Sequence, residues 1–197
     1  MIKRVILLIL VMYSIPIVVS CVKNEYKVMW TGFDIRIIDT SENEKTVIVI
    51  GNIVNKNTFG IEIFMEGINI DVTNKDFGII AECKAATNSF RRGHSMCSIT
   101  IKTLYDYSDN YPSGSDITSL FKVGKIYLSR YQDDKNISTI DELIYATKNI
   151  SRTVSYDWFD LHLMDNSCVG GQQKFEITII LSDETVLVRQ TNNLIME

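Results

Sequence analysis

The chain has little of what divides or cross-links a protein: two prolines, ten glycines and four cysteines among 197 residues. No Pro- or Gly-rich linker interrupts it, so a single domain is expected. Positive charge is also scarce, because 20 Lys and Arg face 24 Asp and Glu, which gives a formal net charge of −4. This mildly acidic balance, without a basic stripe, argues against nucleic-acid binding.

The longest apolar run stands at the N-terminus and is too short to cross a membrane. It covers residues 5–19, follows Lys3 and Arg4, and contains Pro16 near its end. In a helix this run spans about 22 Å, whereas the hydrocarbon core of a bilayer is roughly 30 Å thick. A positive start followed by a short apolar stretch is typical of a cleaved signal peptide.

The run ends in Val18-Val19-Ser20-Cys21. These residues resemble the lipobox of bacterial lipoproteins, in which an aliphatic residue, a tolerant position and a small residue precede a cysteine. The resemblance implies that the Cys21 thiol carries diacylglycerol, that a peptidase cuts between Ser20 and Cys21, and that the new amine receives a fatty acid such as palmitate. Two or three acyl chains hold a protein on a bilayer almost permanently. An ordinary secretory signal or an uncleaved anchor is the alternative.

These features divide the chain into a lipoprotein signal peptide over 1–20, a lipidated tether over 21–27 and a single β-rich domain over 28–197. The expected location is the cell envelope, at the outer membrane. No acidic run follows Cys21, which leaves the periplasmic and the surface face both open. The expected partners are a membrane, through the lipid anchor, and a protein or a glycan, with no nucleic acid.

Alternation of apolar and polar residues predicts that most of the domain is β-strand. In residues 30–37, for example, Phe33 and Ile35 alternate with Asp34 and Arg36, which is the period of a half-buried strand. A β-branched, apolar stretch predicts a central strand over 46–54. The other predicted strands are 59–72, 79–85, 96–104, 159–163, 174–181 and 185–189.

Helical signals are few. Thr139 and Glu142 form a capping box and predict a helix over 140–148. Asp116 predicts the cap of a short helical turn. Eight or so short strands, a C-terminal hairpin around residues 182–184 and one or two short helices favour an antiparallel β-sandwich, immunoglobulin-like or related.

Residues 105–116 carry acidic and aromatic side chains and a Pro-x-Gly-Ser turn, and they lead into a short Leu-Phe segment at 120–121. Together with the Gly-x-Asp-Ile-Arg strand at 32–36 and the final Ser-Asp-Glu turn, this pattern resembles a family of Bacteroidota lipoproteins of about this length. The likeness covers nearly the whole chain from Cys21 onward. It implies location and length, and since that family has no assigned activity, no catalytic residue is carried over.

Three cysteines remain if Cys21 is acylated, which is an odd number for an oxidising compartment. Cys83 and Cys97 each share the apolar parity of a predicted strand, and a hairpin could bring them together. A Cys83–Cys97 disulfide is predicted, and it would contribute about 3 kcal/mol in the chain-entropy description. Two buried free thiols are the alternative. Cys168 lies in a predicted loop and has no assigned partner.

No catalytic motif stands out, and neither a metal nor a cofactor is predicted. Cys168 and His162 could form a nucleophile pair, so a Cys/His-dependent hydrolase is the alternative function, although an exposed strand histidine and a loop cysteine are the simpler interpretation. Exposed aromatic rings could stack on sugars or on a partner protein, and ordinary strand packing would explain them as well. The candidate binding residues are Tyr105, Tyr107, Tyr111, Tyr127 and Tyr131.

The sequence therefore predicts a lipid-anchored envelope protein that acts as a non-catalytic binding or accessory module for a protein or glycan partner. A purely structural component of the envelope is a third possibility. The four lipobox positions, the β-rich body and the missing catalytic motif are the observations that favour the first interpretation.

Overall fold

The computed structural model describes residues 25–41, 47–48, 51–72, 89–128, 131–132, 137–149, 157–165 and 167–197. The chain clusters into two compact units. One contains residues 27–70 and 90–197 and carries nearly all of the sheet structure, and the other contains residues 1–26 and 71–89. The predicted signal peptide and the lipidation site lie outside the described residues.

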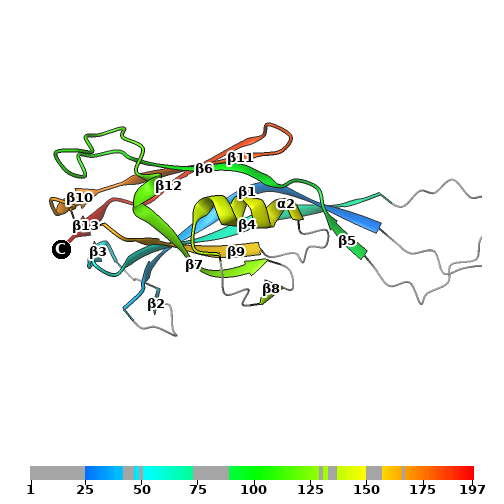
Figure 1. Ribbon diagram of the computed structural model, residues 1–197, viewed down its shortest axis with the longest axis horizontal. Coiled ribbons are helices and arrows are strands. Elements are labelled where there is room, and N and C mark those ends of the chain that lie inside the picture. Colours follow the sequence, from blue (N-terminus) through cyan, green and yellow to red (C-terminus); the bar gives the residue numbers. More distant parts are fainter. Residues whose placement is uncertain are drawn as a thin grey trace, which may run out of the picture. The chain divides into compact units, whose positions relative to one another are not determined.

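Seven strands form the largest sheet. They are β1 (Glu25–Asp39), β2 (Val47–Ile48), β4 (Phe59–Asp71), β5 (Ser89–Arg92), β7 (Phe121–Leu128), β8 (Tyr131–Gln132) and β9 (Asp157–Leu163). Their order is β2-β1-β4-β9-β7-β8, and β5 pairs with β1 (Figure 1). β9 is antiparallel to both of its neighbours, β4 and β7.

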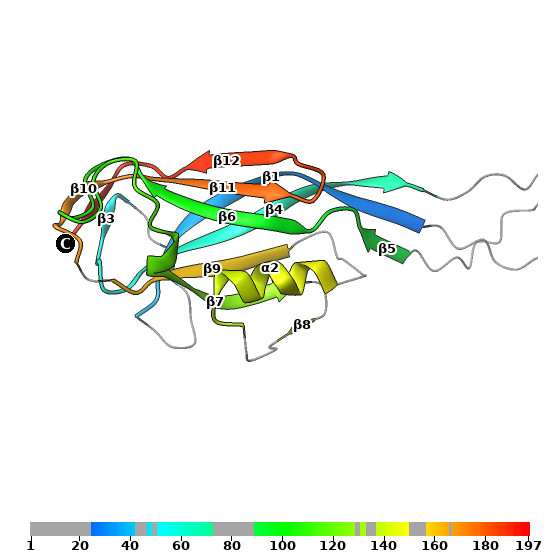
Figure 2. The ribbon, with the colours of Figure 1, turned by 45° about the horizontal axis from the view of Figure 1, so that its top comes forward.

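Two three-stranded sheets complete the fold. Their strands are β3 (Ile53–Val54), β6 (Met96–Thr103), β10 (Gly171–Gln173), β11 (Phe175–Leu181), β12 (Val186–Gln190) and β13 (Leu194–Met196). β11 lies between β6 and β12 and is antiparallel to both. β13 lies between β10 and β3. Figure 2 shows β6, β11 and β12 as a layer over β1, β4, β9 and β7, which confirms the predicted mostly antiparallel sandwich.

The core lies between these layers and is built from the apolar parity of each strand. Phe59 of β4, Phe121 of β7 and Phe175 of β11 meet there with ring centroids 5.5 to 6.5 Å apart. All three rings are buried, and burial of one such side chain stabilises a fold by about 1.5–3 kcal/mol. Aromatic rings from both sheets therefore hold the two layers together.

The helix α2 (Ile140–Asn149) starts at the predicted capping box. The Glu142 N–H donates to the Thr139 hydroxyl at 3.2 Å, and the Thr139 N–H donates to the Glu142 carboxylate at 3.0 Å. Leu143 is fully buried where the helix packs against β6 and β7. The predicted helical turn is present as well, since Thr118 begins the 3₁₀ turn η1 (Thr118–Leu120) and donates its N–H to the Asp116 carboxylate at 2.9 Å.

Three strand predictions need correction. The stretch 46–54 is not one central strand, because β2 and β3 belong to different sheets and Gly51, with a φ of 124°, turns the chain ahead of β3. β1 begins at Glu25, so residues 25–27 of the predicted tether are strand. The strands β5, β7, β8, β10 and β13 are not among the predicted ones. The predicted strand 79–85 lies outside the described residues.

Candidate functional site

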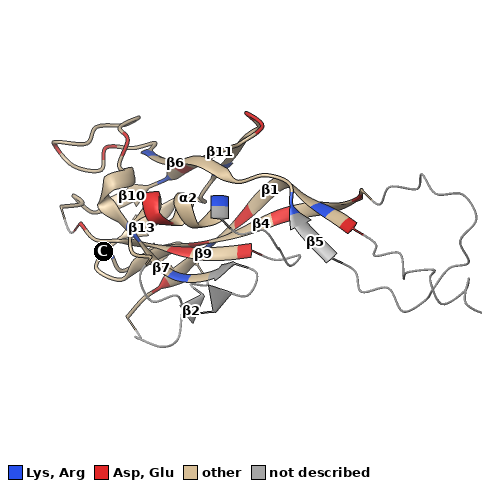
Figure 3. Ribbon diagram, turned by 45° about the vertical axis from the view of Figure 1, so that its right-hand side comes forward, with Lys and Arg blue, Asp and Glu red and all other residues tan. Residues whose placement is uncertain are grey.

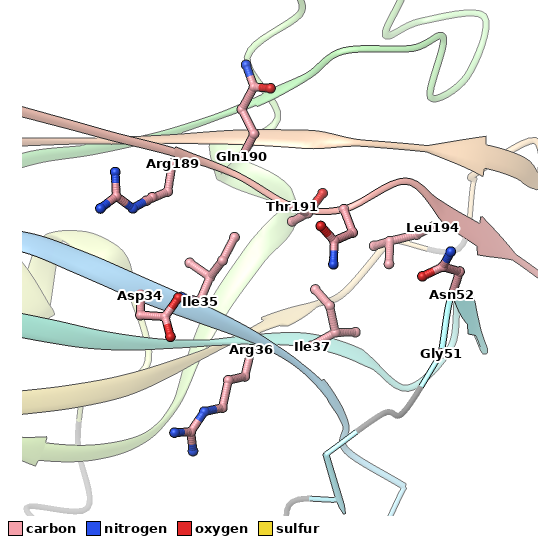
Figure 4. Close-up of a pocket in the computed structure, with 11 residues that line it drawn as sticks. Asp34, Ile35, Arg36, Ile37, Gly51, Asn52, Arg189, Gln190, Thr191 and Leu194 are labelled. Atoms are coloured by element: carbon pink, nitrogen blue, oxygen red, sulfur yellow. The ribbon is translucent and has the colours of Figure 1, made fainter.

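A cleft of about 440 Å³ opens where β1 of the largest sheet lies opposite β12 of the smaller one (Figure 4). We refer to it as the edge cleft. Its walls are residues 34–37 of β1, residues 51–52 ahead of β3, and residues 189–192 and Leu194 of the segment that leads from β12 into β13. Its volume lies within the range of cavities that hold small ligands.

β1 leaves part of one edge without a neighbouring strand along this cleft. Its other edge pairs with β4. On the cleft side, β2 pairs only with Ile38 and Asp39, and the chain just after β5 bonds near the start of β1, where the Gly93 N–H donates to the Val28 oxygen at 2.8 Å. Among the described residues, no strand pairs with residues 33–37 on this edge.

Side chains bond the backbone groups that a neighbouring strand would otherwise bond. The Phe33 carbonyl oxygen accepts a hydrogen bond from the Arg189 Nε–H at 3.0 Å. The Ile35 N–H donates to the Asp34 carboxylate at 2.9 Å. Alternate residues of a strand direct their N–H and C=O groups to the same edge, so Phe33 and Ile35 both face the cleft. The open edge of β1 is thus capped by one cation and one carboxylate.

Arg189 reaches β1 because it lies on the inward parity of β12. Leu187 and Thr191, two residues before and after it, are buried, whereas Val188 is 43% exposed. The Thr191 hydroxyl accepts a hydrogen bond from the Phe175 N–H at 3.0 Å, which fixes the end of β12. β12 pairs with β11 alone in the described part of the chain, and an inward-pointing charge is a common device on such an edge strand.

Sequence reasoning did not single out this site. Asp34 and Arg36 were assigned to the polar face of a strand, and Arg189 to the last strand of a hairpin. The sequence does contain one indication of the site. Arg189 is two residues after Leu187 and therefore on the same face of the strand, where the alternation predicts an apolar residue.

The edge cleft offers binding groups of three kinds. Ile35 and Ile37 point into it and are only half-buried, so they form an apolar floor (Figure 4). The amides of Asn52 and Asn192 supply hydrogen-bond donors and acceptors. Arg189 supplies a positive charge. An apolar floor with a few convergent polar groups is the usual composition of a binding site.

Of the five candidate tyrosines, the structure describes the side chains of Tyr105, Tyr107 and Tyr111. Tyr107 is fully buried, its hydroxyl donates to a backbone oxygen at 2.9 Å, and burial raises the pKa of that hydroxyl above its usual range. Tyr111 is half-buried and packs edge to face against Tyr107, with ring centroids 6.3 Å apart. Tyr105 is 38% exposed. The prediction is therefore wrong for Tyr107, which is a core residue. The side chains of Tyr127 and Tyr131 lie outside the described residues.

Cys97 is exposed, although its sequence parity predicted burial. Ser98 and Met96, two residues apart in β6, pair with two successive residues of β11, so Cys97 is the additional residue of a β-bulge. The bulge ends the alternation, and Met96 takes the buried position. The Cys97 thiol is free in the structure. Cys83 lies outside the described residues, so the Cys83–Cys97 disulfide stays a prediction.

Cys168 and His162 lie in different surroundings. Cys168 is buried in the core with its sulfur 3.6 Å from that of Met196, and burial raises the pKa of its thiol. A buried thiol with a raised pKa is a poor nucleophile. His162 is on the face of β9 opposite to that of the buried Leu161 and Leu163. Its ring lies so close to Gly124 that a Cβ atom added to Gly124 would collide with the ring. These positions do not favour a Cys168–His162 nucleophile pair.

A second polar cluster lies on the outer face of the largest sheet. Glu62 and Asp160 are directly opposite each other across β4 and β9. Burial and the neighbouring Asp160 charge raise the pKa of the Glu62 carboxyl, while Arg36 opposes the shift. The Arg36 guanidinium is 3.9 Å from the Glu62 carboxylate and stacks 4.2 Å above the Phe64 ring. Figure 3 shows only acidic residues, and no Lys or Arg, on β4 and β9, so Glu62 and Asp160 are like charges placed directly opposite each other, an arrangement that weakens cross-strand pairing.

Within the described residues, no group of three His, Cys, Asp or Glu side chains is placed to hold a metal ion. No helix among them is both long enough and apolar enough to span a bilayer. A comparison with protein-family models found no match, and a search of curated proteins found no significant match either.

Proposed function

We propose that this protein is a lipid-anchored module of the bacterial cell envelope that binds a protein or glycan partner through the edge cleft without catalysing a reaction. The observation that carries the binding role is the open edge of β1, where the Arg189 and Asp34 side chains bond the Phe33 carbonyl and the Ile35 N–H in place of a strand. Such groups are available to a ligand that offers equal or better hydrogen bonds.

The anchor is supported by the lipobox residues Val18-Val19-Ser20-Cys21 and by the short apolar run before them. Lipidation of Cys21 would leave only a few residues between the membrane and β1, which begins at Glu25. The module would therefore act close to the bilayer surface, at the outer membrane.

The anchor is tested by expressing the full chain in a bacterium that processes lipoproteins and measuring the mass of its N-terminal peptide. We expect a peptide that begins at Cys21 and carries acyl chains, and we expect the protein in the membrane fraction. The Cys21→Ser variant is the matched control and should keep its signal peptide or leave the membrane. An unmodified Cys21 thiol in the wild-type product would refute the anchor.

The binding role is tested with arrays of defined glycans and of random ten-residue peptides, probed with the wild type and with Arg189→Ala. We expect at least one class of ligand whose signal is lost in this variant. Lys102→Ala removes an exposed cation from β6, outside the cleft lining, and is expected to bind as the wild type does. Binding by neither class, or binding that Arg189→Ala does not reduce, would refute the cleft as the site.

A further inference from the structure

We propose that the edge cleft takes an extended peptide segment of a partner protein, which adds as a strand to residues 33–37 of β1 and presents a carboxylate to Arg189. This inference rests on the proposed function, because it names the class of ligand that the same cleft would bind. Strand addition to an open sheet edge is a recurring mode of peptide recognition.

The backbone of β1 presents the hydrogen-bonding pattern of an unfilled strand position. The Phe33 carbonyl and the Ile35 N–H face the cleft two residues apart, and each is bonded to a side chain in place of a strand. A peptide backbone carries donors and acceptors with the same two-residue repeat, so it can replace both side-chain bonds at once. Sugar hydroxyls do not follow this repeat.

The floor of the cleft fits the side chains of such a strand. Ile35 and Ile37 point into the space between β1 and β12 and remain half-buried, although they share the inward parity of the fully buried Phe33 (Figure 4). In a closed sandwich a further strand would cover them. Every second side chain of an added strand would point to the same interior, so the peptide is expected to carry apolar residues at alternate positions.

Charge favours an acidic peptide over a second copy of this chain. When the peptide replaces both side-chain bonds, the Asp34 carboxylate and the Arg189 guanidinium are released beside it, and the guanidinium can form a charge-assisted pair with a carboxylate of the peptide. Two copies that paired symmetrically through β1 would bring their Arg189 side chains together at one interface. Like charges placed together weaken such a contact, whereas a carboxylate on a foreign segment complements them.

The test is a selection of random ten-residue displayed peptides on the full-length protein, followed by affinity measurement with a synthetic copy of the selected peptide. We expect selected sequences that alternate apolar and polar residues and contain Asp or Glu. Arg189→Ala should weaken binding by about tenfold or more, as expected for loss of a charge-assisted hydrogen bond.

Ile35→Pro tests the strand pairing itself. It removes the N–H that faces the cleft, and Pro is tolerated on an edge strand where the N–H is not part of a ladder. Binding should fall about tenfold. Ile35→Val keeps the N–H and is the matched control, with affinity within about twofold of the wild type. Thermal melting and size-exclusion chromatography establish that each variant is folded and monomeric. N-methylation of the selected peptide removes backbone N–H donors from the peptide side and should also weaken binding.

The outcomes separate this inference from the proposed function. Peptide binding that survives both Ile35→Pro and N-methylation would overturn strand addition. Glycan binding that is lost in Arg189→Ala, without any peptide binding, would overturn the inference and leave the proposed function standing. Absence of both peptide binding and glycan binding would overturn the inference and the proposed function together. Concentration-dependent dimers that Ile35→Pro abolishes would identify a second copy as the occupant and overturn the choice of a foreign peptide.

Discussion

The buried ion pair of Arg92 and Asp157 gives the sharpest stability prediction. The Arg92 Nη2 is 2.6 Å from the Asp157 Oδ2, and the two side chains are 4% and 0% exposed. The same guanidinium donates to the Thr147 carbonyl at 3.1 Å and stacks 4.6 Å from the centre of the Trp30 ring. One arginine thus links β5 to β9, α2 and β1.

Burial opposes both charges of this pair. It lowers the pKa of Arg92 and raises the pKa of Asp157, and in each case the attraction between the two partners only partly offsets the shift. Removal of one partner from a buried pair leaves a charge without compensation and costs about 3–5 kcal/mol. For a chain of this size the melting temperature should fall by about 6–20 °C.

The two single variants should differ in their pH dependence. Asp157→Asn removes the titrating carboxyl and leaves Arg92 charged, because a guanidinium does not lose its proton in this range, so the stability of this variant should show no pH dependence from this site. Arg92→Met leaves Asp157, which can become neutral by binding a proton. Its folded-state pKa is raised, so its stabilising contribution is complete below the unfolded value of 3.8 and is lost as the pH rises through the folded-state pKa. Relative to Asp157→Asn, Arg92→Met should therefore lose stability as the pH rises above the unfolded value.

The assay is urea and thermal unfolding, followed by circular dichroism, at several pH values between about 4 and 7. Arg36→Met serves as the control, since Arg36 is half exposed and its ion pair at 3.9 Å contributes at most about 1 kcal/mol. Parallel pH profiles for Asp157→Asn and Arg92→Met would refute this explanation, and so would a loss no larger than that of Arg36→Met.

Further predictions concern the cysteines, the helix cap and the close contact between Gly124 and His162. Without reductant or denaturant, a maleimide should label Cys97 quickly and Cys168 only after unfolding, as read by peptide mass; an unlabelled Cys97 that reacts after reduction would instead support the predicted disulfide. Thr139→Ala should cost about 1 kcal/mol in urea unfolding, and a change below the error of the measurement would contradict the capping role. Gly124→Ala should cost about 1–3 kcal/mol because the new Cβ collides with His162, and the cost should shrink in a His162→Ala background; equal costs in both backgrounds would contradict the collision.

Local patterns predicted the parts of the fold that depend on local physics. The capping box at Thr139 and Glu142 set the start of α2, and the alternation of apolar residues predicted β4, β9 and β11 close to their observed bounds. In each case the signal and the structure depend on neighbours within a few residues along the chain.

Tertiary pairing decided the features that the sequence did not predict. Cys97 has the parity of a core residue, and only the register between β6 and β11 reveals the bulge that exposes it. Tyr107 looked like a surface ring in an acidic loop, but its hydroxyl finds a backbone partner inside the core. The edge cleft depends on β1 and Arg189 meeting across more than 150 residues of sequence. The periodicity of apolar residues carries no information about contacts between residues that are far apart in the sequence.

Amide hydrogen exchange along β1 tests the central claim of an open strand edge most directly. In the free protein the Ile35 amide, which donates to the neighbouring Asp34 carboxylate, should exchange faster than the amides that bond β4 to β9. Addition of the selected acidic peptide should slow the exchange of Ile35 and of its neighbours within residues 33–37. Binding of that peptide with unchanged exchange at Ile35 would contradict the account.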